Sequence, residues 1–180
     1  PFTLGLWVGS AASPNKRDDA LRKLTQLKSN AKDNPFVLRR CPWCSSKFGV
    51  FEKKWTEQSV RRQPRASKEV LGYVKDAARG TVLFQCPDKL CEFSSKKTDF
   101  MDTKGSNVYL PVCVIDEDLQ ASPPHLLIST VDKFALLAWK PELRTFFGRD
   151  EHSGKQISPP PSLIIQDELH LISGPLGSIV

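Results

Sequence analysis

Four of the five cysteines stand in two close pairs along the chain. Cys41 and Cys44 are separated by two residues, and Cys86 and Cys91 are separated by four. Short turns with these spacings aim two thiolates at one ion in structural zinc sites. None of the three histidines lies near either pair, so four thiolates are the simplest complete ligand set. The spacing therefore predicts a closed, tetrahedral zinc site with a structural role.

Two other interpretations of the cysteine pairs stay open at this point, namely two disulfides or unrelated buried thiols. Disulfides require an oxidising compartment. The sequence has no secretory signal and no apolar run long enough to span a membrane, so we expect a cytoplasmic protein without membrane contact. Cys113 lies in the apolar run 112–115, where we expect it to pack as a small hydrophobic side chain.

A second group of reactive side chains follows the apolar run 163–166. It consists of Asp167, Glu168 and His170. In nucleotide triphosphatases, an aspartate at a strand end holds magnesium, and a following glutamate orients and deprotonates the attacking water. Adjacent residues at a strand end diverge, so one carboxylate can face the metal and the other the water. The pattern predicts a site for magnesium and ATP, and His170 makes this short motif more specific.

The segment 112–118 is a competing candidate, because Asp116, Glu117 and Asp118 also follow an apolar run. We favour Asp167 and Glu168 as the site for magnesium and ATP, because His170 completes a DExH-type motif there and because the motifs follow one another along the chain in the expected order. The acidic residues at 116–118 are then expected to form a solvated loop, with a metal-binding role as the alternative.

Basic residues dominate the first part of the chain. Residues 1–110 carry a net charge of +10 and residues 111–180 a net charge of −4, which together give the +6 of the whole sequence. The segment between the cysteine pairs combines the aromatic residues Phe51 and Trp55 with the basic residues Lys53, Lys54, Arg61, Arg62, Arg65 and Lys68. Cations neutralise phosphates and aromatic rings stack on bases, so this segment is a candidate DNA-binding loop. A merely solvated loop is the alternative.

The reactive side chains need secondary structure to position them. The apolar run 2–8 predicts a buried strand, and apolar residues three and four apart predict an amphipathic helix over 18–31. Further strands are expected within 108–115, at 126–129 and at 163–166. Strands that alternate with helices favour an α/β fold with a mostly parallel sheet, which gathers ligands at the carboxyl ends of its strands.

Thr130 ends the strand expected at 126–129 and is a favourable helix N-cap. Its hydroxyl and the free N–H groups of the following turn can receive a nucleic-acid phosphate, and Lys133 could assist. The alternative is an N-cap without a ligand and a lysine that faces solvent.

The segments LLISTVDKFALLAW and PPSLIIQDELHLISGPLGS resemble those of superfamily 2 helicases, and most closely the helicase component of the DISARM anti-phage defence system. The resemblance implies a partial RecA-like parallel sheet of a helicase motor domain, with an inserted zinc-ribbon-like module. It implies ATP hydrolysis coupled to DNA binding, and other proteins of the defence system as partners. By the same resemblance, Asp167 holds magnesium through water, Glu168 is the general base, His170 couples the nucleotide site to a second motor domain, and Thr130 grips the DNA strand.

The predicted elements and the resemblance together divide the chain into three parts. Residues 1–35 begin the motor domain, residues 36–100 form the four-cysteine module, and residues 101–180 continue the motor domain through the DExH box. The family's Gly-Lys-Ser/Thr phosphate-binding loop does not occur in the sequence. We therefore expect a fragment that begins after this loop and that, by itself, neither hydrolyses ATP nor unwinds DNA. The alternative function is a non-enzymatic zinc-ribbon module that binds nucleic acid.

Overall fold

The computed structural model of the chain describes residues 2–27, 29, 34–52, 68–94 and 108–167. The chain divides into two compact units, here called the sheet unit (Pro1–Ser10 and Val112–Val180) and the cysteine unit (Ala11–Pro111). Because residues 1–10 carry no charged side chain, the basic excess of the sequence belongs to the cysteine unit. This division groups the helix α1 (Arg17–Leu27) with the cysteine pairs.

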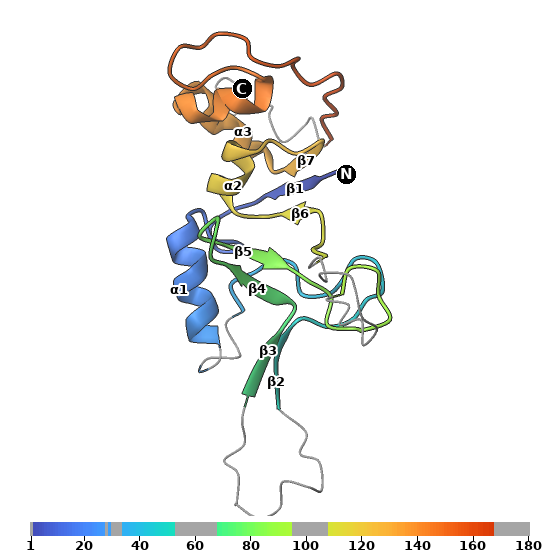
Figure 1. Ribbon diagram of the computed structural model, residues 1–180. Helices are drawn as coiled ribbons and strands as arrows, with labels where there is room; N and C mark the ends of the chain where they lie inside the picture. The colour runs from blue at the N-terminus through green and yellow to red at the C-terminus, as the bar shows by residue number, and fades with distance from the viewer. Residues whose placement is uncertain (1, 28, 30–33, 53–67, 95–107, 168–180) are drawn as a thin grey trace, which may run out of the picture. The chain divides into compact units, whose positions relative to one another are not determined.

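The sheet unit is built on a three-stranded parallel sheet. The strand β1 (Leu4–Trp7) lies in the middle, between β6 (Val112–Cys113) and β7 (Leu126–Ser129), as Figure 1 shows. The strands expected at 2–8 and 126–129 are therefore confirmed, whereas the strand expected within 108–115 contains only two residues. The protein thus has a mixed α/β fold with a small parallel sheet.

Short helices follow the outer strands of this sheet. The helix α2 (Asp116–Ala121) follows β6, and α3 (Val131–Ala135) follows β7. Two 3-10 helices, Leu136–Ala138 and Pro141–Phe147, continue the chain after α3. The short connections keep each helix close to the end of its strand, which is where an α/β sheet presents functional side chains.

The core of the sheet unit forms around Trp7, Leu119 and Leu143, which are almost fully buried. The Trp7 ring packs against the rings of Phe134 and Phe146, with centroid separations of 5.9 and 5.0 Å. Aromatic pairs at such distances contribute favourable contacts beyond the area they bury. The core therefore holds α2, α3 and the last 3-10 helix to β1.

The strand expected at 163–166 is not present in the structure. Residues 163–167 have no regular secondary structure, and the side chains of Leu163, Ile164 and Ile165 are 65–81% exposed. An apolar run becomes a buried strand only where a neighbouring strand supplies hydrogen bonds and other elements cover its faces. Within the described part of the chain, this segment pairs with no strand. The sequence prediction was therefore wrong on this point.

The cysteine unit contains one helix and two antiparallel hairpins. The helix α1 (Arg17–Leu27) packs against β5 (Thr81–Phe84), which pairs with β4 (Tyr73–Asp76). The other hairpin joins β2 (Gly49–Glu52) to β3 (Lys68–Leu71). Figure 1 shows these elements in blue and green. The helix expected over 18–31 is confirmed over 18–27, and Ser29 lies in a turn after its end.

An aromatic core fixes the segment that leads to the first cysteine pair. Phe36 is fully buried, with its ring 4.7 Å from that of Tyr73 and 5.9 Å from that of Phe84. The Tyr73 hydroxyl donates to the Leu38 carbonyl at 2.9 Å and accepts a bond from the Asn34 amide at 2.7 Å. The segment before Cys41 is thus anchored by both packing and hydrogen bonds.

Candidate metal centre

The first knuckle is a tight turn formed by residues 40–47. Its ends pair as an isolated antiparallel bridge. Within it, the Cys41 N–H donates to the Ser46 carbonyl and the Ser45 N–H donates to the Cys41 carbonyl, both at 2.8 Å. Ser45 has a φ of 64°, a left-handed conformation that closes the turn. These bonds place the side chains of Cys41 and Cys44 on the same side of the turn.

The second knuckle, residues 86–94, directly follows β5. The Cys86 N–H donates to the Phe93 carbonyl at 2.8 Å, and the Cys91 N–H donates to the Asp88 carbonyl at 3.0 Å. The strand therefore delivers the first thiol of this pair, and a local turn returns the second thiol beside it.

The two knuckles bring their four sulfur atoms together. The Sγ atoms of Cys41, Cys44, Cys86 and Cys91 all lie within 4.8 Å of one another. Sulfur atoms from different knuckles are 4.0 Å apart for Cys41 and Cys91 and 3.4 Å apart for Cys44 and Cys86. Tetrahedral zinc–thiolate bonds of about 2.3 Å require sulfur separations of about 3.8 Å. The predicted convergence of the four cysteines is confirmed, and their geometry can hold a metal ion.

The disulfide interpretation does not agree with this arrangement. All five cysteines are free, and the 3.4 and 4.0 Å separations far exceed the length of about 2.05 Å of an S–S bond. The interpretation as unrelated buried thiols fails as well, because four sulfur atoms from two distant segments meet in one cluster.

The surroundings of the cluster favour ionisation of the Cys44 thiol but oppose ionisation of the Cys86 and Cys91 thiols. Hydrogen bonding with the side chain and backbone of Ser46 lowers the pKa of Cys44 to about 6. Burial raises the pKa of Cys86 and also that of Cys91. Cys41, Cys86 and Cys91 are buried, so a bound cation would be largely shielded from water. Such a cation would displace the protons of the buried thiols, since the thiolate is the ligand form.

Cys113 lies apart from this cluster, in β6 of the sheet unit. It is half-buried and packs against the core formed by Trp7, Leu119 and Leu143. Its expected role as a small hydrophobic side chain is confirmed.

The DExH-type residues are only partly described. Asp167 is exposed at the end of the irregular segment 163–167. Glu168 and His170 lie outside the described residues. Their expected roles in binding magnesium and ATP therefore stay predictions.

The expected solvated loop at 116–118 is instead the first turn of α2. Asp116 is buried, and its Oδ2 accepts a hydrogen bond from the Nζ of Lys133 at 2.6 Å. The Lys133 ammonium also lies 5.6 Å from the centroid of the Trp7 ring. The alternative that Lys133 faces solvent is thus wrong, because its charge is neutralised inside the sheet unit. Its expected contact with nucleic acid stays a prediction. Acidic side chains in a first turn also match the positive end of the helix dipole.

Thr130 occupies the expected N-cap position of α3. Its backbone is extended, and its side chain is exposed and makes no capping hydrogen bond. The hydroxyl is therefore available at the carboxyl end of β7.

The predicted DNA-binding arginines, Arg61, Arg62 and Arg65, lie outside the described residues, in the segment that joins β2 to β3. Three other cations lie at the base of the first knuckle and were not among the predicted site residues, namely Arg39, Arg40 and Lys47. The signal that could have found them is the position of basic residues on both sides of the first cysteine pair.

Comparison with known proteins finds a relative of this chain. The chain is 30% identical over 209 aligned residues to the DISARM protein DrmA of Bacillus paralicheniformis. The alignment covers 99% of this chain but 16% of that protein, so the chain spans about a sixth of the length of its relative. A scan against protein-family models finds no match. The expected similarity to a DISARM protein is therefore confirmed, since the chain is related to DrmA.

In the part of the chain that the structure describes, no helix combines the length and the apolar character that crossing a bilayer requires.

Proposed function

We propose that this chain is part of the motor region of an ATP-dependent DNA helicase or translocase of superfamily 2, acting in DISARM-type defence against phage. The observation that carries this proposal is the similarity to DrmA, which extends over 99% of the chain. The parallel order β6-β1-β7 supports it, because a RecA-like motor domain is organised around such a sheet.

In this proposal, the DExH-type residues serve the nucleotide. Bound magnesium would polarise the terminal phosphate of ATP and neutralise its charge. Asp167 would hold this ion through water, Glu168 would accept the proton of the attacking water, and His170 would transmit the state of the site to a second motor domain. The phosphate-binding loop would come from a part of the protein outside this sequence.

The cysteine cluster would bind a structural zinc ion. Four thiolates leave no open coordination position for a substrate, so a catalytic role for this ion is not expected. Zinc would join the two knuckles and fix the cysteine unit. Thr130 of the sheet unit and Arg61, Arg62 and Arg65 of the basic segment would contact the DNA backbone.

A glutamate substitution tests the motor. In the intact protein, Glu168→Gln removes the proposed base but keeps the shape of the side chain. ATP turnover is expected to fall by about 100-fold or more, while ATP binding is largely kept. Turnover is measured as phosphate release and binding as retention of labelled ATP. Glu117→Gln, at the competing acidic segment, is the matched control and is expected to keep its turnover.

Turnover at the wild-type rate in the Glu168→Gln variant would refute the role of this residue. Loss of turnover in the Glu117→Gln variant, with Glu168→Gln unaffected, would move the site to the segment 116–118.

A second candidate function is a non-enzymatic zinc module that binds nucleic acid. The exposed, irregular segment 163–167 favours it, because a nucleotide-binding aspartate normally sits at the end of a buried strand. Absence of ATP turnover in the wild-type intact protein, together with retained DNA binding, would support this alternative.

A further inference from the structure

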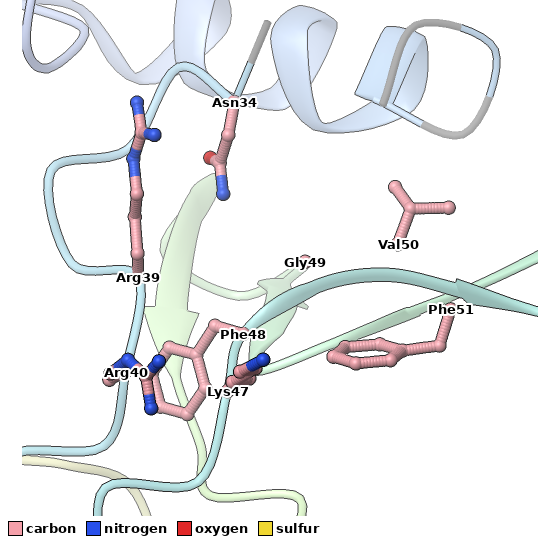
Figure 2. A pocket seen from close by; sticks show the side chains of 8 residues that line it. All are labelled: Asn34, Arg39, Arg40, Lys47, Phe48, Gly49, Val50 and Phe51. Carbon is pink, nitrogen blue, oxygen red and sulfur yellow. The ribbon is translucent and has the colours of Figure 1, made fainter. Parts of the chain in front are cut away.

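A basic groove lies beside the first knuckle, within the cysteine unit. It has a volume of about 390 Å³, and its lining includes Arg39, Arg40, Lys47 and Phe51 (Figure 2). The three cationic side chains are exposed to solvent. Among the described residues that line the groove, none is acidic. Its chemical character is therefore that of a receptor for anions.

The backbone holds two of these cations in an unfavourable arrangement. Arg40 and Lys47 are directly opposite each other in the antiparallel bridge that closes the first knuckle. Like charges at opposing positions destabilise a strand pair. Among the residues that the structure describes, neither side chain pairs with a carboxylate, and the Arg40 guanidinium has one hydrogen bond, to the Ser45 carbonyl at 3.4 Å. Folding alone gives no reason for this pairing, whereas a bound anion would neutralise both charges.

The groove is also built rigidly enough to hold a ligand. The Phe48 N–H donates to the Arg39 carbonyl at 2.9 Å, and the Phe48 side chain is buried. Asn34 is fixed by its hydrogen bond to the Tyr73 hydroxyl. Backbone pairing and packing thus set the positions from which the three cations extend.

An aromatic side chain adds a second kind of contact. Figure 2 shows the ring of Phe51 directed along β2 toward Lys47, and this ring is half-buried. Cations that track a backbone, combined with a partly open ring on which a base can stack, are the usual elements of a surface that binds single-stranded nucleic acid. An acidic peptide would use the cations but would gain less from a flat ring.

We propose that this groove binds the phosphodiester backbone of single-stranded nucleic acid, through Arg39, Arg40 and Lys47, with Phe51 stacking on a base. This inference deepens the proposed function, on which it rests, by assigning a DNA contact to the first knuckle. The residues that form this site are not among the three arginines, Arg61, Arg62 and Arg65, predicted from the sequence to bind DNA.

The test is a charge-matched comparison in the intact protein. One variant combines Arg39→Ala, Arg40→Ala and Lys47→Ala. The control combines Lys16→Ala, Lys75→Ala and Lys89→Ala, which removes the same charge from exposed positions of the same unit. Binding of a labelled single-stranded DNA oligonucleotide is measured by fluorescence anisotropy over a range of salt concentrations, with duplex DNA and poly-glutamate as further probes. Circular dichroism and zinc content verify that both variants fold.

The groove variant is expected to lose roughly tenfold or more in affinity for single-stranded DNA, and the slope of log affinity against log salt should become shallower by about 2. This slope change corresponds to about 0.7 for each of three lost phosphate contacts on a single strand. The control variant should keep both its affinity and its slope. Phe51→Ala should weaken binding without changing the slope, because stacking releases no counterion.

Several results would overturn the proposal that the groove binds single-stranded nucleic acid. These are equal losses in the two triple variants, unchanged affinity in the groove variant, no binding by the wild type, tighter binding of the duplex than of the single strand, or binding of poly-glutamate as tight as that of DNA. Wild-type ATP turnover, measured in parallel, separates the two proposals. If the wild type hydrolyses ATP and the groove variant keeps its DNA affinity, the helicase proposal stands and the groove proposal fails. If the groove variant loses DNA affinity and the wild type does not hydrolyse ATP, the groove proposal stands and the helicase proposal fails.

Discussion

Single residues inside the sheet unit carry charge where water is scarce. Asp116 and Lys133 form a buried ion pair at 2.6 Å, beside the ring of Trp7. The second carboxylate oxygen, Oδ1 of Asp116, is buried without a hydrogen-bond partner in the described part of the chain. A buried pair of this kind adds little net stability, because removing both charges from water offsets their attraction. Loss of only one partner lowers stability, however, because the remaining charge stays buried without an opposite charge beside it.

We expect Asp116→Ala to lower the free energy of unfolding by about 3 kcal/mol, because the Lys133 ammonium keeps its burial but loses a carboxylate. The double variant Asp116→Leu with Lys133→Met should recover most of this loss, since it removes both charges. Urea denaturation of the three proteins measures the difference. A single variant as stable as the wild type would show that the pair does not hold α2 to α3.

At the scale of elements, β1 is the strand on which the sheet unit depends, because it pairs with both β6 and β7. Gly5, in its middle, allows the neighbouring side chains to approach closely. A Cβ atom at this position would lie 2.5 Å from Pro124, 2.6 Å from Leu119 and 2.9 Å from Leu127. Side chains from α2, from the loop that follows it and from β7 therefore all pack against the backbone at Gly5.

We expect Gly5→Ala to destabilise the sheet unit by about 1–3 kcal/mol, because the added methyl group overpacks this contact. Gly9→Ala is the matched control, since a Cβ atom there meets nothing within 4 Å. Thermal unfolding of both variants measures the effect. Equal melting temperatures for the two variants would contradict the close approach at Gly5.

At the scale of the whole molecule, charge and candidate chemistry follow the division into units. The cysteine unit carries the net charge of +10 and all four candidate metal ligands, whereas the sheet unit carries the net charge of −4 and Asp167. A metal ion that joins the two knuckles would therefore stabilise the cysteine unit, whereas the stability of the sheet unit would depend on its own hydrophobic core.

We expect purified protein to contain one zinc ion per chain, and chelation to open the cysteine unit selectively. Amide exchange in β4 and β5 should accelerate on the order of tenfold or more, because metal-binding free energy contributes directly to folding free energy. Exchange in β1 and β7 should change little. Hydrogen exchange with mass spectrometry makes the comparison, and Cys113→Ser, which keeps all four ligands, is the control. Absence of zinc, or equal acceleration in both units, would contradict the site.

The sequence by itself determined the features that arise within a few residues. Two cysteine pairs at knuckle spacing, the periodic apolar residues of α1 and the apolar runs of β1 and β7 each reflect local backbone geometry. These predictions agree with the structure because their physical causes lie in the segment itself. Short motifs also indicated the relationship to the DISARM protein DrmA, to which the chain is 30% identical.

Only the tertiary structure decided which distant segments meet. It brought the second cysteine pair to the first and buried Lys133 against Asp116. It also left the apolar run 163–166 without a strand partner. Contacts of this kind depend on the packing of elements far apart along the chain. The type of a residue states what it can bind, whereas its neighbours in space determine what it does bind.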